Sequence, residues 1–130
     1  MLALALIYGA AGLAAEVCDG AWKAALRHDW SLEAHVRLWV GGVYAIGGLA
    51  VHGLALVLAG EPLALRVVAY TLAIYAIEGG AGAAVLRATG RRLWLYTDPW
   101  SIGGLVTLKY LPAWVALAFA VERFALWIGP

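Results

Sequence analysis

Residues 70–87, with the sequence YTLAIYAIEGGAGAAVLR, decide how the fold of this chain is interpreted. The stretch is almost entirely apolar and carries one carboxylate, Glu78, near its middle. A helix needs about 20 apolar residues to cross the hydrocarbon core of a bilayer. With its apolar flanks, the stretch therefore predicts a membrane-spanning helix that holds an acidic side chain inside the membrane.

An earlier part of the chain has the same design. Residues 8–25 read YGAAGLAAEVCDGAWKAA, and they align with the first stretch at an offset of about 62 residues. The offset pairs Tyr8 with Tyr70, Glu16 with Glu78, Gly20 with Gly82, and the Gly-Gly pair at 41–42 with that at 103–104. This pattern predicts two copies of a two-helix unit, with one buried acid in the first helix of each.

The composition places the whole chain in the membrane. Of its residues 65% are hydrophobic and 13% charged, and its mean hydropathy is +0.86. Such a composition excludes a soluble domain with a polar surface. We expect an all-α integral membrane protein whose residues 1–130 form a single four-helix domain, with two tandem repeats related by a pseudo-twofold axis along the membrane normal. The expected spans are residues 2–22, 38–59, 64–86 and 104–127.

Basic residues predict the orientation of these spans. They concentrate in the first and third connections and near the start of the fourth span, at Lys23, Arg27, Arg37, Arg87, Arg91, Arg92 and Lys109. Only Arg66 and Arg123 fall on the opposite side. The positive-inside rule makes the first and third loops cytoplasmic and places both termini outside, as in a multi-pass protein of a bacterial-type plasma membrane.

The third connection and the fourth span carry features of their own. Trp94, Tyr96 and Trp100 lie in the connection and suit either an aromatic belt at headgroup level or a lid. Pro112 interrupts the expected fourth span, where it predicts a kink. A break at residues 109–112 beside an apolar continuation is also typical of a re-entrant segment.

Four charged residues form the main candidate site: Glu16, Asp19, Glu78 and Lys109. Glu16 and Asp19 share one face of the first helix, and we expect Glu16 to approach Glu78 near the pseudo-twofold axis. Charges inside a bilayer are costly and usually functional, so one interpretation is a cation or proton site. In the other interpretation Lys109 neutralises the carboxylates and fixes the helix register.

Two further residues complete the candidate set. His52, which shares a helix face with Tyr44 and Gly48, could relay protons or bind a metal, although a hydrogen-bonded interior histidine is favoured. Tyr110, next to Lys109, is the second. Glu122 and Arg123 are interpreted as interfacial charges with no special role. No cofactor and no nucleic-acid partner are expected, and a metal site is left open.

Four motifs carry a resemblance to a known family. They are E-x-x-x-G-A-W at residues 16–22, Y-T-L-x-x-Y-x-x-E at 70–78, W-x-Y at 94–96 and G-L-V-T-L-K-Y-x-P-x-W at 104–114. In order and spacing they resemble the vertebrate transmembrane protein 229 family and its bacterial relatives, which are commonly labelled putative ABC-transporter permeases. The resemblance implies a four-helix integral membrane protein.

The sequence supports three functional hypotheses. The first is a small transport or channel subunit for a cation, proton or small polar substrate, which would work as a homo-oligomer or with an ATPase partner chain. The second is a non-transporting assembly or accessory protein whose buried charges are structural. The third is an intramembrane enzyme that acts on a lipid, and it lacks a complete nucleophile or metal constellation.

Overall fold

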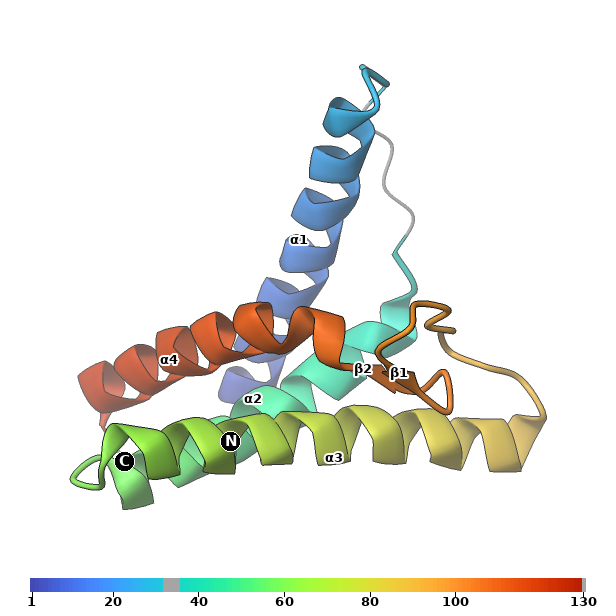
Figure 1. Cartoon of the computed structure of the whole chain (residues 1–130). Coiled ribbons are helices and arrows are strands. Elements are labelled where there is room, and N and C mark those ends of the chain that lie inside the picture. The colour runs from blue at the N-terminus through green and yellow to red at the C-terminus, as the bar shows by residue number, and fades with distance from the viewer. Residues whose placement is uncertain (32–35, 130) are drawn as a thin grey trace. The chain divides into compact units, whose positions relative to one another are not determined.

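The computed structural model of the chain describes residues 1–31 and 36–129 and contains the four predicted helices (Figure 1). They are α1 (Leu2–Leu26), α2 (Leu38–Leu58), α3 (Leu63–Thr89) and α4 (Leu111–Ile128). Each is long and apolar enough to cross a membrane, in agreement with a multi-pass membrane protein. Between α3 and α4 lie two short strands, β1 (Ser101–Ile102) and β2 (Val106–Thr107), and the 3-10 helix η1 (Leu108–Tyr110).

The chain forms two compact units, Met1–Ile46 and Gly47–Pro130, and we describe each by itself. In the first unit, α1 packs on the first turns of α2 through small residues. A Cβ atom added to Gly12 would lie 2.0 Å from Cγ of Tyr44, and one added to Gly41 would lie 3.0 Å from Cδ1 of Leu13. Glycine at these positions therefore lets the two backbones approach closely, as is usual where helices pack in lipid.

The second unit is built on α3, α4 and the remaining turns of α2. Its buried core consists of Val51, Ala55, Tyr70, Ala118 and Ala125. The start of α3 lies beside the end of α4, so these two helices run side by side in opposite directions (Figure 1). The relation of the two predicted two-helix repeats by a pseudo-twofold axis, and the single domain over residues 1–130, stay predictions.

The start of the fourth span was predicted wrongly. Residues 104–110 are a turn, a strand and a 3-10 helix, and α4 begins only at Leu111. Gly104 has a left-handed φ of +70°, and a Cβ atom there would lie 2.6 Å from Cδ1 of Leu95, so this position turns the chain instead of opening a helix. Pro112 lies in the first turn of α4, where proline is tolerated, and it does not kink a helix interior.

The first connection also begins later than expected. Helix α1 continues past residue 22 to Leu26, and Asp29 then accepts hydrogen bonds from the backbone and hydroxyl of Ser31, at 3.1 and 2.8 Å. From the sequence, Asp29 or Ser31 could cap a short helix in this connection, but that helix would fall largely on residues 32–35, which lie outside the described residues.

Candidate functional site

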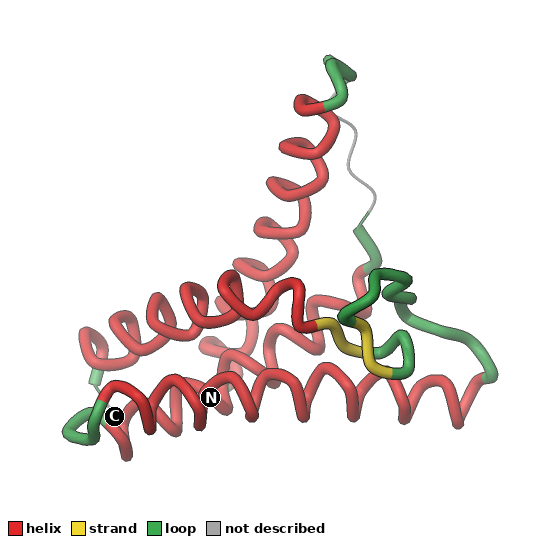
Figure 2. The backbone as a smooth tube through the Cα atoms, in the orientation of Figure 1, coloured by secondary structure: helices red, strands yellow, loops and turns green. Residues whose placement is uncertain are grey.

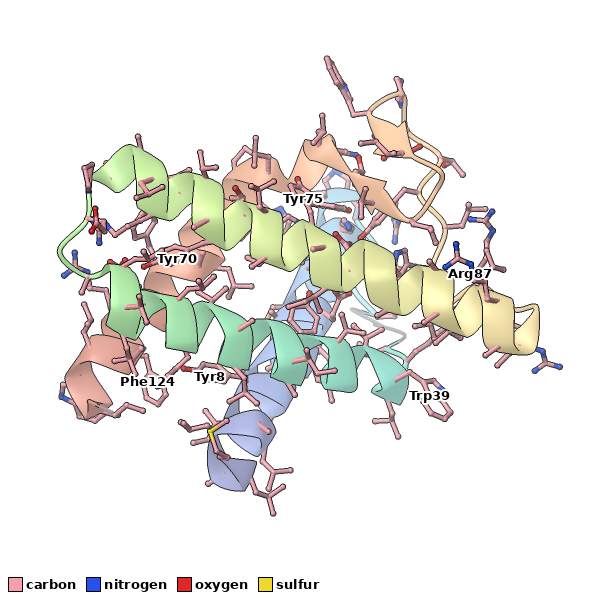
Figure 3. The ribbon with its side chains drawn as sticks, turned by 90° about the horizontal axis from the view of Figure 1, so that it is seen from below. Tyr8, Trp39, Tyr70, Tyr75, Arg87 and Phe124 are labelled. Carbon is pink, nitrogen blue, oxygen red and sulfur yellow. The ribbon has the colours of Figure 1, made fainter. Side chains whose placement is uncertain are left out.

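The connection between α3 and α4 folds back onto α3 as a hairpin. We call residues 91–110 the loop hairpin. Its strands β1 and β2 pair antiparallel, with Ser101 opposite Thr107 and Ile102 opposite Val106 (Figure 2). The hydroxyl of Tyr75 donates a hydrogen bond of 3.1 Å to the carbonyl of Thr107. Figure 3 shows Tyr75 on the side of α3 that faces the hairpin and Arg87 near the end of the helix.

The loop hairpin reaches far along the helix. Tyr75 precedes Thr89, the last residue of α3, by 14 residues, or about 21 Å of helix. Helix α4 has 18 residues against 27 in α3, and the difference of nine residues corresponds to about 14 Å. The hairpin takes the place of these missing turns. The re-entrant interpretation of residues 109–112 concerns their depth in a membrane and stays a prediction.

Glycines next to Glu78 make the docking of the hairpin possible. A Cβ atom on Gly82 would lie 3.0 Å from Cδ2 of Leu105 and 3.3 Å from Cζ2 of Trp94, and one on Gly79 would lie 3.3 Å from Cγ1 of Val106. The small residues that follow Glu78 therefore form the surface on which the hairpin rests.

The carbonyl groups of the hairpin have protein donors. Trp94 Nε1 donates to the carbonyl of Leu105 at 2.7 Å, and Arg92 Nη1 donates to that of Gly103 at 3.1 Å. The backbone amide of Tyr96 donates to the carbonyl of Gly104 at 3.0 Å. Non-helical backbone is tolerated at membrane depth only where protein or a water-filled cavity satisfies its polar groups. Here protein groups satisfy these three carbonyls, as such a segment would require at membrane depth.

Glu78 is the carboxylate that the hairpin covers. It is 7% exposed, and the Tyr96 hydroxyl donates a hydrogen bond of 2.6 Å to its Oε1 atom. The ring of Tyr110 lies 5.9 Å from that of Tyr96, centroid to centroid. The structure thus brings together two predicted candidates, Glu78 and Tyr110, around a tyrosine that was expected only in a belt or lid.

Lys109 lies at the surface of the loop hairpin. Its side chain is exposed, and within the described part of the chain it forms no ion pair with Glu78. Thr107 is extended and its hydroxyl accepts from the Lys109 amide, so Lys109 falls in the 3-10 helix η1, before α4 begins. Its role as the counter-charge of the acidic cluster stays a prediction.

The two candidate acids of the first unit have separate partners. The Tyr44 hydroxyl donates a hydrogen bond of 2.7 Å to Oε1 of Glu16. Asp19 pairs with Lys23, one turn along the same helix, and both side chains are about half exposed. Glu16 and Glu78 therefore share one chemistry, a carboxylate that accepts from a tyrosine hydroxyl. The predicted approach of Glu16 to Glu78 joins two different units and stays a prediction.

The remaining candidate, His52, is buried in α2 at 7% exposure. Across residues 1–31 and 36–129, no group of three or more His, Cys, Asp or Glu side chains could hold a metal ion. His52 therefore belongs to no such metal-binding group among these residues. Its role as a hydrogen-bonded interior histidine stays a prediction.

A second charged cluster was missed. Glu122, interpreted as an interfacial charge without a role, is fully buried. Arg66 Nη1 lies 2.7 Å from both of its carboxylate oxygens, and the Tyr70 hydroxyl donates to Oε2 at 2.6 Å. The Arg66 guanidinium also lies 5.6 Å from the centre of the Phe119 ring. The spacing of Arg66 and Tyr70, four residues apart on α3, was the signal that could have found it.

No protein-family model matches the chain, and no solved structure matches it. A function for the chain is therefore inferred from its sequence and from the geometry within each unit.

Within the loop hairpin, Asp98 gives the fold a dependence on pH. The hydroxyl of Thr107 donates to Asp98 at 2.7 Å, and the backbone amide of Trp100 donates at 3.0 Å. The Thr107 hydrogen bond first, and then the Trp100 amide and the nearby Lys109 charge, hold the pKa of Asp98 below its ordinary value of 3.8. A lowered pKa stabilises the hairpin above that ordinary value, and the stabilisation is lost as the pH falls through the lowered pKa.

We therefore expect Thr107→Val to raise the pKa of Asp98 toward 3.8. NMR titration of the aspartate carboxyl signals in detergent micelles measures the change. Asp29 is the internal control, because its lowered pKa comes mainly from hydrogen bonds with Ser31. An Asp98 titration that is identical in the variant would show that Thr107 does not set this pKa.

Proposed function

We propose that this chain is a small transport or channel subunit that moves a proton or small cation across the membrane, with Glu78 as the carboxylate that binds it. The observation that carries the proposal is the hydrogen bond from Tyr96, in the loop hairpin, to the buried Glu78. Acidic side chains within membrane-spanning helices usually mark ion or proton paths. The resemblance to putative ABC-transporter permeases agrees with this proposal.

The loop hairpin supplies a means of access to Glu78. Its carboxylate oxygen is occupied by the Tyr96 hydroxyl, and the same tyrosine belongs to a non-helical segment that rests on glycines. Movement of the hairpin away from α3 would break this bond and the one from Tyr75 to the Thr107 carbonyl, and would expose the oxygen to an ion or a proton donor from the loop side. Glu16 with Tyr44 would act in the same way within the first unit.

Four short helices enclose little space, so the transporting form would be a homo-oligomer or would include a partner chain such as an ATPase. The predicted orientation places the loop hairpin on the cytoplasmic side. Access to Glu78 would then be from the cytoplasm.

The test is a flux assay with purified protein in liposomes, using a trapped pH-sensitive dye for protons and a cation gradient for sodium or potassium. Glu78→Gln keeps the size of the side chain and removes its charge, so flux should fall to the level of empty liposomes. Tyr96→Phe should alter the rate, because Glu78 then loses the hydroxyl that covers it. Glu61→Gln, an exposed acid in the turn before α3, is the matched control and should leave flux unchanged.

The alternative is an assembly or accessory protein whose buried charges are structural, and the Arg66–Glu122 pair is the observation that favours it. If no flux exceeds that of empty liposomes, and Glu78→Gln only lowers stability, the alternative holds. Equal flux through the Glu78→Gln variant and the unmodified protein would remove Glu78 from the path.

A further inference from the structure

The loop hairpin has two faces of different character. Its inner face rests on α3. Tyr96 donates a hydrogen bond to Glu78 of α3, and the carbonyl of Thr107 accepts one from Tyr75 of α3. Trp94 donates to the carbonyl of Leu105 within the hairpin. Other side chains of the hairpin are large, apolar and exposed. They are Leu95, Trp100 and Leu108, and Trp100 is 65% exposed.

A basic rim accompanies this apolar face. Arg87, Arg91 and Lys109 are exposed, and within the described residues none of them forms an ion pair. The one carboxylate of the hairpin, Asp98, is already bonded to Thr107 and Trp100. The loop hairpin and the end of α3 therefore offer three exposed cations beside apolar side chains, against the single carboxylate of Asp98.

The position of the hairpin decides what meets this face. Both of its ends continue directly into spanning helices, α3 and α4, so the hairpin must lie at or within the boundary of the bilayer. Tryptophan and basic residues are the side chains that prefer this boundary, with the apolar parts toward the acyl chains and the charges toward the headgroups. A soluble acidic partner would match the cations but not the exposed apolar side chains.

We propose that the outer face of the loop hairpin binds anionic phospholipids of the surrounding membrane. Arg87, Arg91 and Lys109 would contact the phosphate groups, and Trp100 and Leu108 would contact the glycerol and the first acyl carbons. The proposal concerns a lipid site and does not depend on transport through Glu78.

Native mass spectrometry of the purified protein in detergent, titrated with phosphatidylglycerol or with phosphatidylcholine, tests the proposal. The unmodified protein should retain phosphatidylglycerol in preference to phosphatidylcholine. The triple variant R87Q/R91Q/K109Q should bind phosphatidylglycerol about 100-fold more weakly, because each basic residue near an anionic surface contributes roughly a fivefold factor. Arg92 is kept in all variants because it donates to the carbonyl of Gly103.

Three controls make the outcome unambiguous. Arg123→Gln removes an exposed cation near the end of α4 and should leave the preference intact. R87K/R91K preserves charge and should keep binding, which separates a loss of charge from misfolding in the triple variant. Inorganic phosphate in excess should not displace phosphatidylglycerol, and displacement would mean a simple anion site. Equal retention of both lipids by the unmodified protein would overturn the proposal.

Discussion

Glu122→Gln is expected to lower the free energy of unfolding by about 3 to 5 kcal/mol, the usual cost of removing one partner of a buried ion pair. The carboxylate is fully buried and the Arg66 side chain is only 16% exposed, so water cannot replace the lost charge. The neutral amide would leave the Arg66 cation without an anion between α3 and α4. Unfolding in mixed micelles, followed by circular dichroism, measures the loss.

A double-mutant cycle separates the ion pair from packing. In R66L/E122L both charges are removed together, and much of the loss should be recovered because no uncompensated charge remains. Arg123→Gln is the matched control, since Arg123 is the next residue in the chain and is exposed, and its effect should stay within about 0.5 kcal/mol. Equal effects of Glu122→Gln and Arg123→Gln would show that the pair does not stabilise the fold.

Gly12→Ala is expected to destabilise the first unit by about 1 to 3 kcal/mol, the usual cost of overpacking. The added methyl group would lie 2.0 Å from Cγ and 2.4 Å from Cβ of Tyr44. Because these atoms are near the backbone, Tyr44 cannot avoid the methyl group by a small rotation. Helices α1 and α2 would have to separate, and the hydrogen bond from Tyr44 to Glu16 would be lost with them.

Gly42→Ala is the control for this substitution. Gly42 lies in the turn of α2 that also holds Tyr44, yet an added Cβ atom there would contact nothing within 4 Å. Its replacement should be neutral or slightly stabilising, because alanine favours a helix over glycine by about 0.5 to 1 kcal/mol. Micelle unfolding of both variants gives the comparison, and similar midpoints would mean that the close approach at Gly12 has no energetic importance.

The helices could be predicted from sequence because composition and length alone determine which segments cross a membrane. The start of α4 could not. Residues 104–108 are as apolar as a helix, and only the left-handed glycines at 103 and 104 and the early Pro112 distinguish them. Apolar content does not distinguish a short extended segment such as β2 from the first turn of a helix.

The candidate site was likewise predicted only in part. The burial of Glu78 followed from its place in an apolar helix, but its partner Tyr96 did not, since their contact depends on how the hairpin folds back. Glu122 was misjudged because its neighbour Arg123 and the nearby chain end suggested a charge at the interface. An isolated arginine in the first turns of a span, such as Arg66, should have prompted a search for its anion.

The distance between Arg66 and Glu122 along the chain also bears on biosynthesis. Ribosomes add roughly 5 to 20 residues per second, so the 56 residues that separate the two partners take about 3 to 11 seconds to make. During this interval the cation of α3 has been made, and the anion that balances it does not yet exist. A nascent chain arrested before residue 122 therefore lacks the carboxylate that pairs with Arg66. The charge of Arg66 is balanced by this pair only after α3 and α4 have both been made.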